Sequence, residues 1–260
     1  MHWIIQENFC REASWDSLVE FLERMQIPYS MHKVVPFVGD LIPEPVINEK
    51  NVIVMGSYAL RHPAKRHGWI PGVFDLHEHD FERQREHWGK HMLNFDSRVC
   101  TFRDIEFGDE PVLFIRPIHD SKVFSGNVYD PELVAEWKRN LALGDLGNGS
   151  SLGLETPVQV CIPKQIYAEY RYWIVAGQIA TRSQYKRGDR VVASPEVDER
   201  IDEYVRARVA EWQPAEAFVI DVCETPERYK IVEINTLNAA GYYAANLPKL
   251  VMALEEMYVE

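Results

Sequence analysis

The sequence has few cysteines, no long apolar run and fewer basic than acidic residues. Its four cysteines, at positions 10, 100, 161 and 223, are widely separated and form no CxxC pair, which argues against a disulfide framework or a zinc knuckle. No stretch approaches the roughly 20 apolar residues that a membrane-spanning helix needs, and the first residues lack the basic and apolar segments of a signal peptide. We therefore expect a cytoplasmic protein with no membrane partner.

The charge balance limits the partners that the protein is expected to bind. The chain of 260 residues has 28 basic and 40 acidic residues, which gives a net charge of −12 at pH 7. This balance argues against general nucleic-acid binding, because phosphate backbones are bound by basic surfaces. Any phosphate site must therefore be a local cluster of basic residues. A hydrophobic content of 46% with 12% aromatic residues indicates a globular protein with one large domain or two lobes.

The hydrophobic pattern predicts a different organisation in each half of the chain. Over the first hundred residues, short apolar runs alternate with stretches of helical spacing, which is typical of an α/β lobe. After a strand predicted at 112–118 and a helix predicted at 131–141, antiparallel hairpins dominate, with two later amphipathic helices. We therefore predict an α/β lobe over residues 1–100 and an α+β domain over residues 101–260.

Two carboxylates and an amide are predicted to meet in a hairpin near the end of the chain. In a strand over 230–235, side chains alternate between the two faces, so Ile231, Glu233 and Asn235 share one face. A preceding strand and a turn containing a proline would bring Asp221 beside them. Oxygen ligands this close together repel one another unless a cation lies between them, and Mg²⁺ carried by a nucleotide is the commonest such cation. A polar strand face open to water is the alternative, and the motif by itself does not decide between the two.

A second hairpin is predicted to bring basic residues together. Two alternating runs at 169–175 and 178–186 are separated by a two-residue turn. In the direct register, Arg171 lies opposite Arg182 on one face, and Lys186 extends the same row. Like charges directly opposite each other are destabilising unless an anion lies between them, and guanidinium groups suit phosphate oxygens. The alternative is a charged hairpin that is fully solvated.

Two further clusters have alternative interpretations. His77 and His79 in the segment DLHEHD could form a metal pair, but no third ligand follows at a suitable spacing, so a polar loop is favoured. Gly56 and Ser57 end a predicted strand and precede a helix with a basic face. Together they form either an anion-binding site or an ordinary solvated surface. The basic residues of that face are Arg61, Lys65, Arg66 and His67.

From about residue 112 onward, the sequence resembles an ATP-grasp domain, and the whole chain is similar to the bacterial and phage clade of that superfamily named for its two arginines and a lysine. The hairpin that ends in Glu-Ile-Asn carries the resemblance most specifically, and it implies that Asp221, Glu233 and Asn235 are magnesium ligands. The stretch VLFIRPIHDSKVFSG resembles the strand and flexible loop that cover the nucleotide phosphates, with Arg116 and Lys122 as cationic candidates. The resemblance implies an N-terminal α/β pre-ATP-grasp lobe followed by a two-lobed, antiparallel-sheet ATP-grasp domain.

The same resemblance implies roles for other residues. Residues 158–162 resemble the segment whose backbone hydrogen-bonds adenine, and Glu169 would follow near the ribose. The cofactor-binding candidates in that segment are Gln159, Cys161 and Ile162. The basic residues over the transferred phosphate would be Arg171, Arg182 and Lys186. Residues directly after the magnesium motif are candidates for the acceptor pocket, or alternatively for a close helix approach; they are Asn238, Gly241, Tyr242 and Tyr243.

The resemblance implies a ligase that depends on Mg²⁺ and ATP and that joins a carboxylate to an amine or related nucleophile through an acylphosphate. Its partners would be a small-molecule or peptide carboxylate and a nucleophile acceptor, and neither their identity nor the oligomeric state follows from the sequence. A phosphotransferase that uses the same site is one alternative. A nucleotide-binding module without turnover is the other, because Arg116 stands where most relatives carry lysine.

Overall fold

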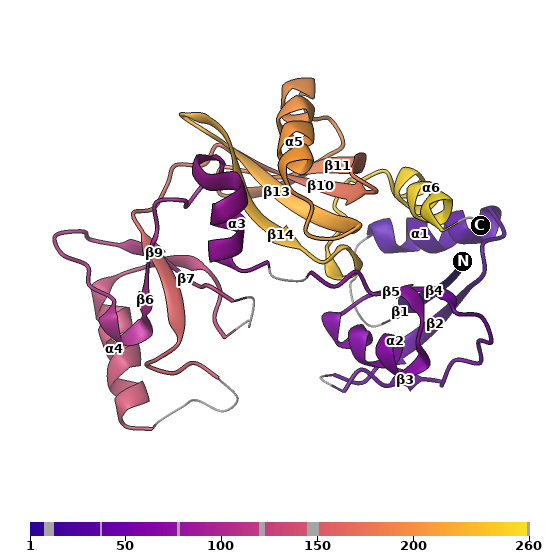
Figure 1. Ribbon diagram of the computed structural model, residues 1–260, viewed down its shortest axis with the longest axis horizontal. Helices are drawn as coiled ribbons and strands as arrows, with labels where there is room; N and C mark the ends of the chain where they lie inside the picture. Colours follow the sequence, from indigo (N-terminus) through magenta and orange to yellow (C-terminus); the bar gives the residue numbers. More distant parts are fainter. Residues whose placement is uncertain (8–12, 37, 77–78, 120–122, 145–150, 259–260) are drawn as a thin grey trace. The chain divides into compact units, whose positions relative to one another are not determined.

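The structure is a computed structural model that describes the chain except for residues 8–12, 37, 77–78, 120–122, 145–150 and 259–260 (Figure 1). The chain forms two compact units. The first unit combines Met1–His77 with Ile166–Glu260, and the second unit is Glu78–Gln165. These units are defined by spatial contacts, and the first unit contains segments from both ends of the chain. They therefore do not test the domain boundary near residue 100, which stays a prediction.

A mostly parallel sheet forms the N-terminal part of the first unit. Its order is β3-β2-β1-β4-β5, with β3 antiparallel at one edge and the other pairs parallel. Because parallel neighbours need a crossover connection, α1 follows β1 and α2 follows β4. This arrangement confirms the predicted α/β lobe. The elements are β1 (His2–Gln6), α1 (Ala13–Arg24), β2 (Tyr29–Val34), β3 (Leu41–Ile42), β4 (Asn51–Met55), η1 (Tyr58–Leu60), α2 (Arg61–His67) and β5 (Ile70–Gly72).

An antiparallel sheet forms the C-terminal part of the first unit, in the order β12-β11-β10-β13-β14. The amphipathic helix α5 packs on one face of this sheet (Figure 1), where Tyr172 of β10 donates a hydrogen bond to Asp202 of the helix. The elements are β10 (Ala168–Val175), β11 (Gln178–Arg187), β12 (Arg190–Ser194), α5 (Glu199–Glu211), β13 (Ala217–Thr225), β14 (Arg228–Asn235) and η4 (Leu237–Ala239).

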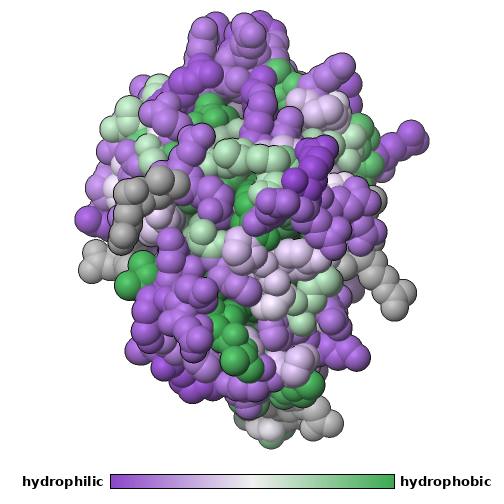
Figure 2. Space-filling view, turned by 90° about the vertical axis from the view of Figure 1, so that its right-hand side faces the viewer, coloured by the Kyte–Doolittle hydropathy of each residue, from purple (hydrophilic) through white to green (hydrophobic). Residues whose placement is uncertain are grey.

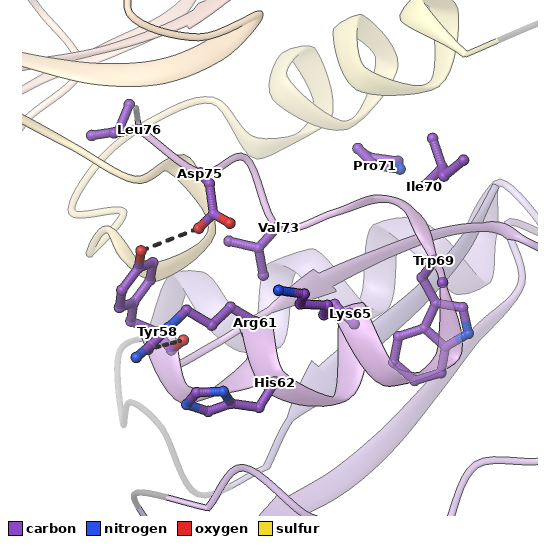
Figure 3. A pocket seen from close by; sticks show the side chains of 12 residues that line it. Tyr58, Arg61, His62, Lys65, Trp69, Ile70, Pro71, Val73, Asp75 and Leu76 are labelled. Carbon is purple, nitrogen blue, oxygen red and sulfur yellow. Dashed lines mark hydrogen bonds between the residues drawn. The ribbon is translucent and has the colours of Figure 1, made fainter. Parts of the chain in front are cut away.

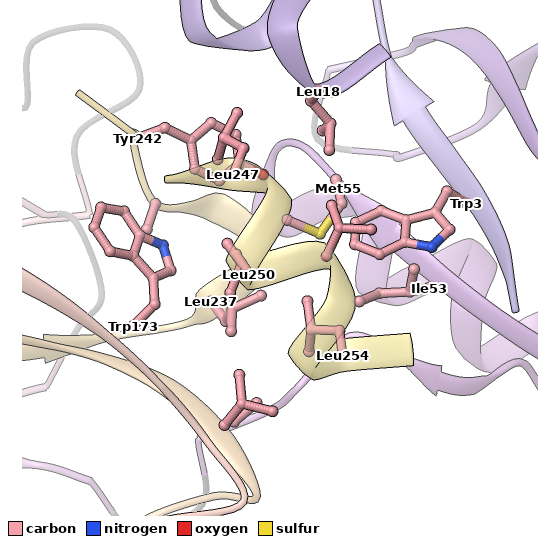
Figure 4. Close-up of a cluster of buried hydrophobic side chains, with 14 of the residues drawn as sticks. Trp3, Leu18, Ile53, Met55, Trp173, Leu237, Tyr242, Leu247, Leu250 and Leu254 are labelled. Atoms are coloured by element: carbon pink, nitrogen blue, oxygen red, sulfur yellow. The ribbon is translucent and has the colours of Figure 1, made fainter. Parts of the chain in front are cut away.

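The last helix, α6 (Leu247–Met257), joins the two sheets of the first unit through a shared core. Its buried residues are Leu247, Leu250, Val251 and Leu254. The same hydrophobic cluster contains Trp3 from β1 and Trp173 from β10, and Figure 4 shows these side chains on either side of the helix. The predicted closing helix is therefore confirmed, and one core holds together segments from both ends of the chain.

The second unit is a small antiparallel sheet in the order β6-β9-β7-β8, packed against α4. Its core includes Phe102, Ile115 and Val134. The helix predicted at 131–141 is confirmed, and Asp130 caps it by accepting a hydrogen bond from the backbone N–H of Leu133. The elements are α3 (Phe81–Trp88), η2 (Gly89–His91), β6 (Arg98–Thr101), η3 (Phe102–Asp104), β7 (Leu113–Pro117), β8 (Asn127–Tyr129), α4 (Pro131–Ala142) and β9 (Pro157–Cys161).

In the part of the chain that the structure describes, every helix is too short or too polar to cross a membrane. The face of the molecule in Figure 2 is mostly hydrophilic, and its hydrophobic residues lie in small separate patches.

The register of the β10–β11 hairpin corrects a prediction. Pairing follows the direct register only beside the turn, because Ala180 is an extra, unpaired residue in β11. Beyond this bulge, Arg182 lies opposite Tyr172, and Arg171 lies opposite Ser183. A bulge inserts one residue and so reverses the alternation of side chains. The predicted Arg171–Arg182 pair is therefore wrong, and the two arginines point to opposite faces of the sheet.

The β13–β14 hairpin agrees with the prediction at its polar positions and differs at one apolar position. Asp221 lies beside Glu233, as predicted, and is directly opposite it in the ladder. The register then shifts, so that Val222 lies opposite Ile231. Because Val222 and Asp221 are neighbours in one strand, they face opposite sides. Ile231 is thus on the buried face with Val222, and the prediction that it shares a face with Glu233 is wrong.

Candidate active site

Two carboxylates and one amide meet on β13 and β14. Asp221 and Glu233 are directly opposite each other across the ladder. The amide Nδ2 of Asn235 donates to Oε1 of Glu233 at 3.0 Å and to Oδ2 of Asp221 at 3.3 Å. Asp221 is almost completely buried, with 1% of its surface exposed. The structure therefore brings the predicted oxygen ligands together, within hydrogen-bonding distance of a common amide.

Arg171 of β10 holds the carboxylate of Asp221. Its Nε and Nη2 donate to the two oxygens of Asp221 at 2.8 and 2.7 Å, which is the two-pronged geometry that guanidinium groups favour. Nη1 also donates to the carbonyl oxygen of Gly241 at 3.3 Å. Burial raises the pKa of Asp221 to about 6, and the charge of Arg171 opposes this rise. The ion pair therefore keeps a buried carboxylate beside Glu233, in a position where an isolated charge would be costly.

Two tyrosine rings lie against Arg171, and one of them is hydrogen-bonded to a glutamate. Its guanidinium carbon lies 5.4 Å from the ring centroids of Tyr185 and of Tyr243, which are stacked on each other. The hydroxyl of Tyr185 donates to Glu169 at 2.8 Å, and the ammonium group of Lys186 pairs with the same carboxylate at 2.8 Å. Adjacent residues of a regular strand face opposite sides. Tyr185 and Lys186 both reach Glu169 because Tyr185 is an extra residue in the pairing of β10 with β11.

Arg182 lies apart from this cluster, on the face of the sheet covered by α5. Its Nε forms an ion pair with Oδ1 of Asp202 at 3.0 Å. The hydroxyl of Tyr172 donates to the same oxygen at 2.9 Å. Asp202 has 3% of its surface exposed, so a buried carboxylate occupies the guanidinium group of Arg182. The structure brings together Arg171, Lys186, Glu169, Asp221, Glu233 and Asn235, and it does not bring Arg182 to them.

The nucleotide candidates of the second unit lie on β7 and β9. Arg116 is directly opposite Gln159, so both side chains are on one face of this sheet. A Cβ atom on Gly126 would lie 2.9 Å from Cδ and 3.0 Å from Cγ of Arg116, so glycine allows the backbone at position 126 to pack on the arginine. Gln159 is buried, and among the described residues its Oε1 has no hydrogen-bond donor. An acceptor oxygen is therefore left available on that face.

The other candidates of the second unit differ in their exposure. Cys161 is buried, its Sγ donates to Oδ1 of Asn94 at 3.4 Å, and burial raises the pKa of its thiol. Ile162 is 52% exposed. Lys122 lies outside the described residues.

The histidine pair is not supported as a metal site by the described residues. His77 lies outside them, and the backbone oxygen of His79 accepts a hydrogen bond from Gln84. Within the described ranges, no group of three or more histidine, cysteine, aspartate and glutamate residues is arranged to hold a metal ion. The oxygen site on β13 and β14 has two carboxylates, and its third donor is the amide of Asn235.

The model of an ATP-grasp domain family matches residues 45–254; it is family 3 of the clade named for two arginines and a lysine. The chain belongs to this ATP-grasp family. The match covers most of the sequence and confirms the resemblance inferred from the Glu-Ile-Asn hairpin. No curated protein matches the sequence of the chain.

Solved ATP-grasp structures are similar to this one over nearly the whole chain. An ATP-grasp RimK domain protein from Sphaerobacter thermophilus is 12% identical, with a TM-score of 0.61, over 99% of this chain and 97% of that chain. D-alanine–D-alanine ligase from Bacillus anthracis, complexed with ATP, is 14% identical, with a TM-score of 0.57, over 99% and 95%. Macrocyclase MdnC from Microcystis aeruginosa, bound with precursor peptide MdnA, is 14% identical, with a TM-score of 0.51, over 100% of both chains. At these identities the likeness shows the fold, and the predicted ATP-grasp fold class is confirmed.

Two residues that determine where the predicted basic residues lie, Tyr185 and Asp202, are not found by sequence reasoning. Regular alternation places Tyr185 on the face opposite Lys186, so the pattern gives no reason to include it. Asp202 reads as an ordinary acidic position of an amphipathic helix, and nothing in its spacing marks it as the partner of Arg182. Tyr243 is marked by its place after the Glu-Ile-Asn motif, and the structure stacks it on Tyr185.

Proposed function

We propose that this protein is an ATP-dependent ligase that uses Mg²⁺ and joins a carboxylate to an amine or related nucleophile through an acylphosphate. The observation that carries the proposal is the meeting of Asp221, Glu233 and Asn235 with the cation of Arg171. Phosphoryl transfer places little covalent work on side chains, so a protein that positions and neutralises phosphate groups supplies most of what the reaction needs.

The oxygen site suits Mg²⁺ by the chemistry of its donors. Magnesium is bound by one or two carboxylates together with waters and substrate phosphates, and Asp221 and Glu233 provide two carboxylates on facing strands. Rotation of the Asn235 amide would present its oxygen in place of the Nδ2 that now donates to both acids. When bound, the metal would neutralise negative charge on the nucleotide phosphates.

The basic residues on the same face would bind the transferred phosphate group. Arg171 is oriented by Asp221 and by two tyrosine rings, so little side-chain entropy is lost when it contacts an anion. Lys186 is held beside it through Glu169. We leave Arg182 out of this role because Asp202 holds it on the other face.

In the second unit, we retain Arg116 and Gln159 as contacts to the nucleotide. Arg116 supplies a cation on β7, and the buried Oε1 of Gln159 is an acceptor suited to an amino group such as that of adenine. Cys161 is the last residue of β9, and Ile162 follows it. The resemblance implies that the backbone of this segment forms hydrogen bonds with adenine.

The substrates are proposed as a carboxylate, from a small molecule or a peptide, and a nucleophile. Support comes from the fold, which is shared with a D-alanine–D-alanine ligase and with a macrocyclase that was solved bound to a precursor peptide. The substrates named there are those of the two other proteins. The acid that this chain activates is identified by the following assay.

A hydroxylamine trap tests the proposal directly. The purified protein is incubated with ATP, Mg²⁺, hydroxylamine and a panel of amino acids, peptides and other acids. Release of ADP together with a hydroxamate that depends on one acid would show an activated carboxylate. Release of ADP with a phosphorylated alcohol and no hydroxamate would replace the ligase with a phosphotransferase, and ATP binding without ADP release across the panel would favour a module without turnover.

A further inference from the structure

A cavity in the N-terminal part of the first unit has a basic wall. Its volume is about 730 Å³, and it lies between α2 and the segment that contains β5. Figure 3 shows Arg61, His62 and Lys65 on the helix side, with Asp75 beyond them. The volume lies in the range of small-molecule sites in proteins.

One end of the cavity is polar and held in place by hydrogen bonds. The guanidinium carbon of Arg61 lies 4.2 Å from the ring centroid of Tyr58, and its Nη1 donates to the backbone oxygen of Tyr58 at 3.0 Å. The hydroxyl of Tyr58 donates to Oδ1 of Asp75 at 3.1 Å (Figure 3). Tyr58 and Asp75 follow β4 and β5, so this end lies at the carboxyl ends of parallel strands, where open α/β sheets bind ligands.

The middle of the cavity carries positive charge. Lys65 lies between the two ends (Figure 3), and within the described ranges its ammonium group has no hydrogen-bond or ion-pair partner. Arg61 and Lys65 outnumber Asp75 among the fully charged lining residues, in a protein whose net charge is −12. A local excess of positive charge on an acidic protein favours an anionic ligand.

The other end of the cavity is apolar. Ile70 and Pro71 lie there (Figure 3), and Ile70 is 61% exposed although it is a large hydrophobic residue, whereas Trp69, which also lines the cavity, is only 7% exposed. The ring of Trp69 is fixed by stacking on His67, with centroids 4.5 Å apart. A ligand that has an anionic group and an apolar body would therefore match both ends.

The polar end is tied to the proposed magnesium site through Asn238. This buried residue lies three positions after Asn235, and its Oδ1 accepts from the backbone N–H of Phe74, next to Asp75. Its backbone oxygen accepts from the N–H of Gly56, two residues before Tyr58. The strand end that carries the metal ligands is thus anchored beside the polar end of the cavity.

We infer that this cavity binds a substrate of the ligase through a carboxylate held by Arg61 and Lys65, with an apolar body packed on Ile70 and Pro71. The chemical class is an amino acid or a peptide end with an apolar side chain. The inference rests on the proposed function for its role as a substrate site, whereas the binding itself is tested without turnover.

The test compares two probes and two variants by ligand-observed NMR titration. N-acetyl-L-leucine carries the carboxylate and the apolar body, and N-acetyl-L-leucinamide lacks only the charge. We expect saturable binding of the acid, much weaker binding of the amide, and about tenfold weaker binding of the acid to Lys65→Gln, which loses one charged hydrogen bond. The matched control is Arg66→Gln, which removes a charge from the same helix, where Arg66 pairs with Asp40 and does not line the cavity.

The inference is overturned if the acid fails to bind, if the amide binds as well as the acid, or if both variants weaken binding equally. Inorganic phosphate serves as a third probe, and phosphate binding without acid binding would replace the carboxylate ligand with a phosphate. Binding of a non-hydrolysable ATP analogue with Mg²⁺ is measured on the same samples. Failure of that binding in the wild type counts against the proposed function, while its retention in Lys65→Gln shows that only the cavity has been changed.

Discussion

At the scale of single residues, Arg171 is the centre of the proposed active site. It makes a two-pronged ion pair with Asp221, it lies against Tyr185 and Tyr243, and it bonds the carbonyl of Gly241. Lysine could supply the charge but neither the fork nor the flat surface that stacks on aromatic rings. The site therefore depends on the shape of guanidinium as well as on its charge.

Arg171→Lys is predicted to reduce turnover by about 100-fold or more, because one charge aligned with the transferred phosphate would be misplaced. The comparison is Arg182→Lys, whose guanidinium is held by Asp202 on the other face. We expect that variant to change turnover by less than about threefold. ADP release under saturating ATP measures both, and equal losses would show that Arg182 belongs to the site after all.

At the scale of elements, Gly126, directly before β8, packs against Arg116 of β7. Gly126 lies against the aliphatic part of that side chain, and any Cβ would approach it more closely than carbon atoms allow. Gly126 and the arginine are therefore packed together, and a larger residue at position 126 would move the cation without altering its charge.

Gly126→Ala is predicted to weaken binding of a non-hydrolysable ATP analogue by up to about tenfold, because Arg116 must shift from its place. Gly153→Ala is the matched control in the same unit. A Cβ at that position meets only Oγ1 of Thr156 at 3.8 Å, an ordinary contact. Calorimetric titration of both variants measures the effect, and unchanged affinity in Gly126→Ala would remove Arg116 from the nucleotide site.

The two hairpins show which parts of the site can be predicted from sequence. The meeting of Asp221 and Glu233 was predictable only in part, because the turn brings the two strands together, whereas the bulge at Val232, which has no sequence signal, places Glu233 directly opposite Asp221. The face of Arg182 was not predictable, because the bulge at Ala180 has no sequence signal and reverses the side chains that follow it in β11, until the second bulge at Tyr185 returns Lys186 to the predicted face. The long-range partners of Asn238 depend on packing between distant segments, which local patterns do not encode.

At the scale of the whole molecule, the first unit is built from both ends of the chain around α6 and Asn238. The amide of Asn238 donates to the backbone oxygens of Val54 and Gly72 and accepts from Phe74, all inside the protein. One buried side chain thus joins the end of the antiparallel sheet to two strands of the parallel sheet.

Asn238→Ala is predicted to lower the free energy of unfolding by about 3 kcal/mol, because it leaves buried backbone groups without partners. The control is Asn140→Ala on the exposed face of α4, with an expected change within about 0.5 kcal/mol. Urea unfolding followed by circular dichroism measures both. Equal small changes would show that the amide of Asn238 does not hold the two sheets together.

The most direct test of the account is the magnesium dependence of nucleotide binding. Calorimetric titration with a non-hydrolysable ATP analogue is run with and without Mg²⁺ on the wild type, on Glu233→Ala and on Glu227→Ala. Glu227 is an exposed acid in the turn of the same hairpin, paired with Lys230. We predict that Mg²⁺ strengthens binding to the wild type and to Glu227→Ala, and that Glu233→Ala loses this gain. The proposed site would be contradicted if Mg²⁺ left the affinity of the wild type for the ATP analogue unchanged, or if Mg²⁺ raised the affinity of Glu233→Ala as much as that of the wild type.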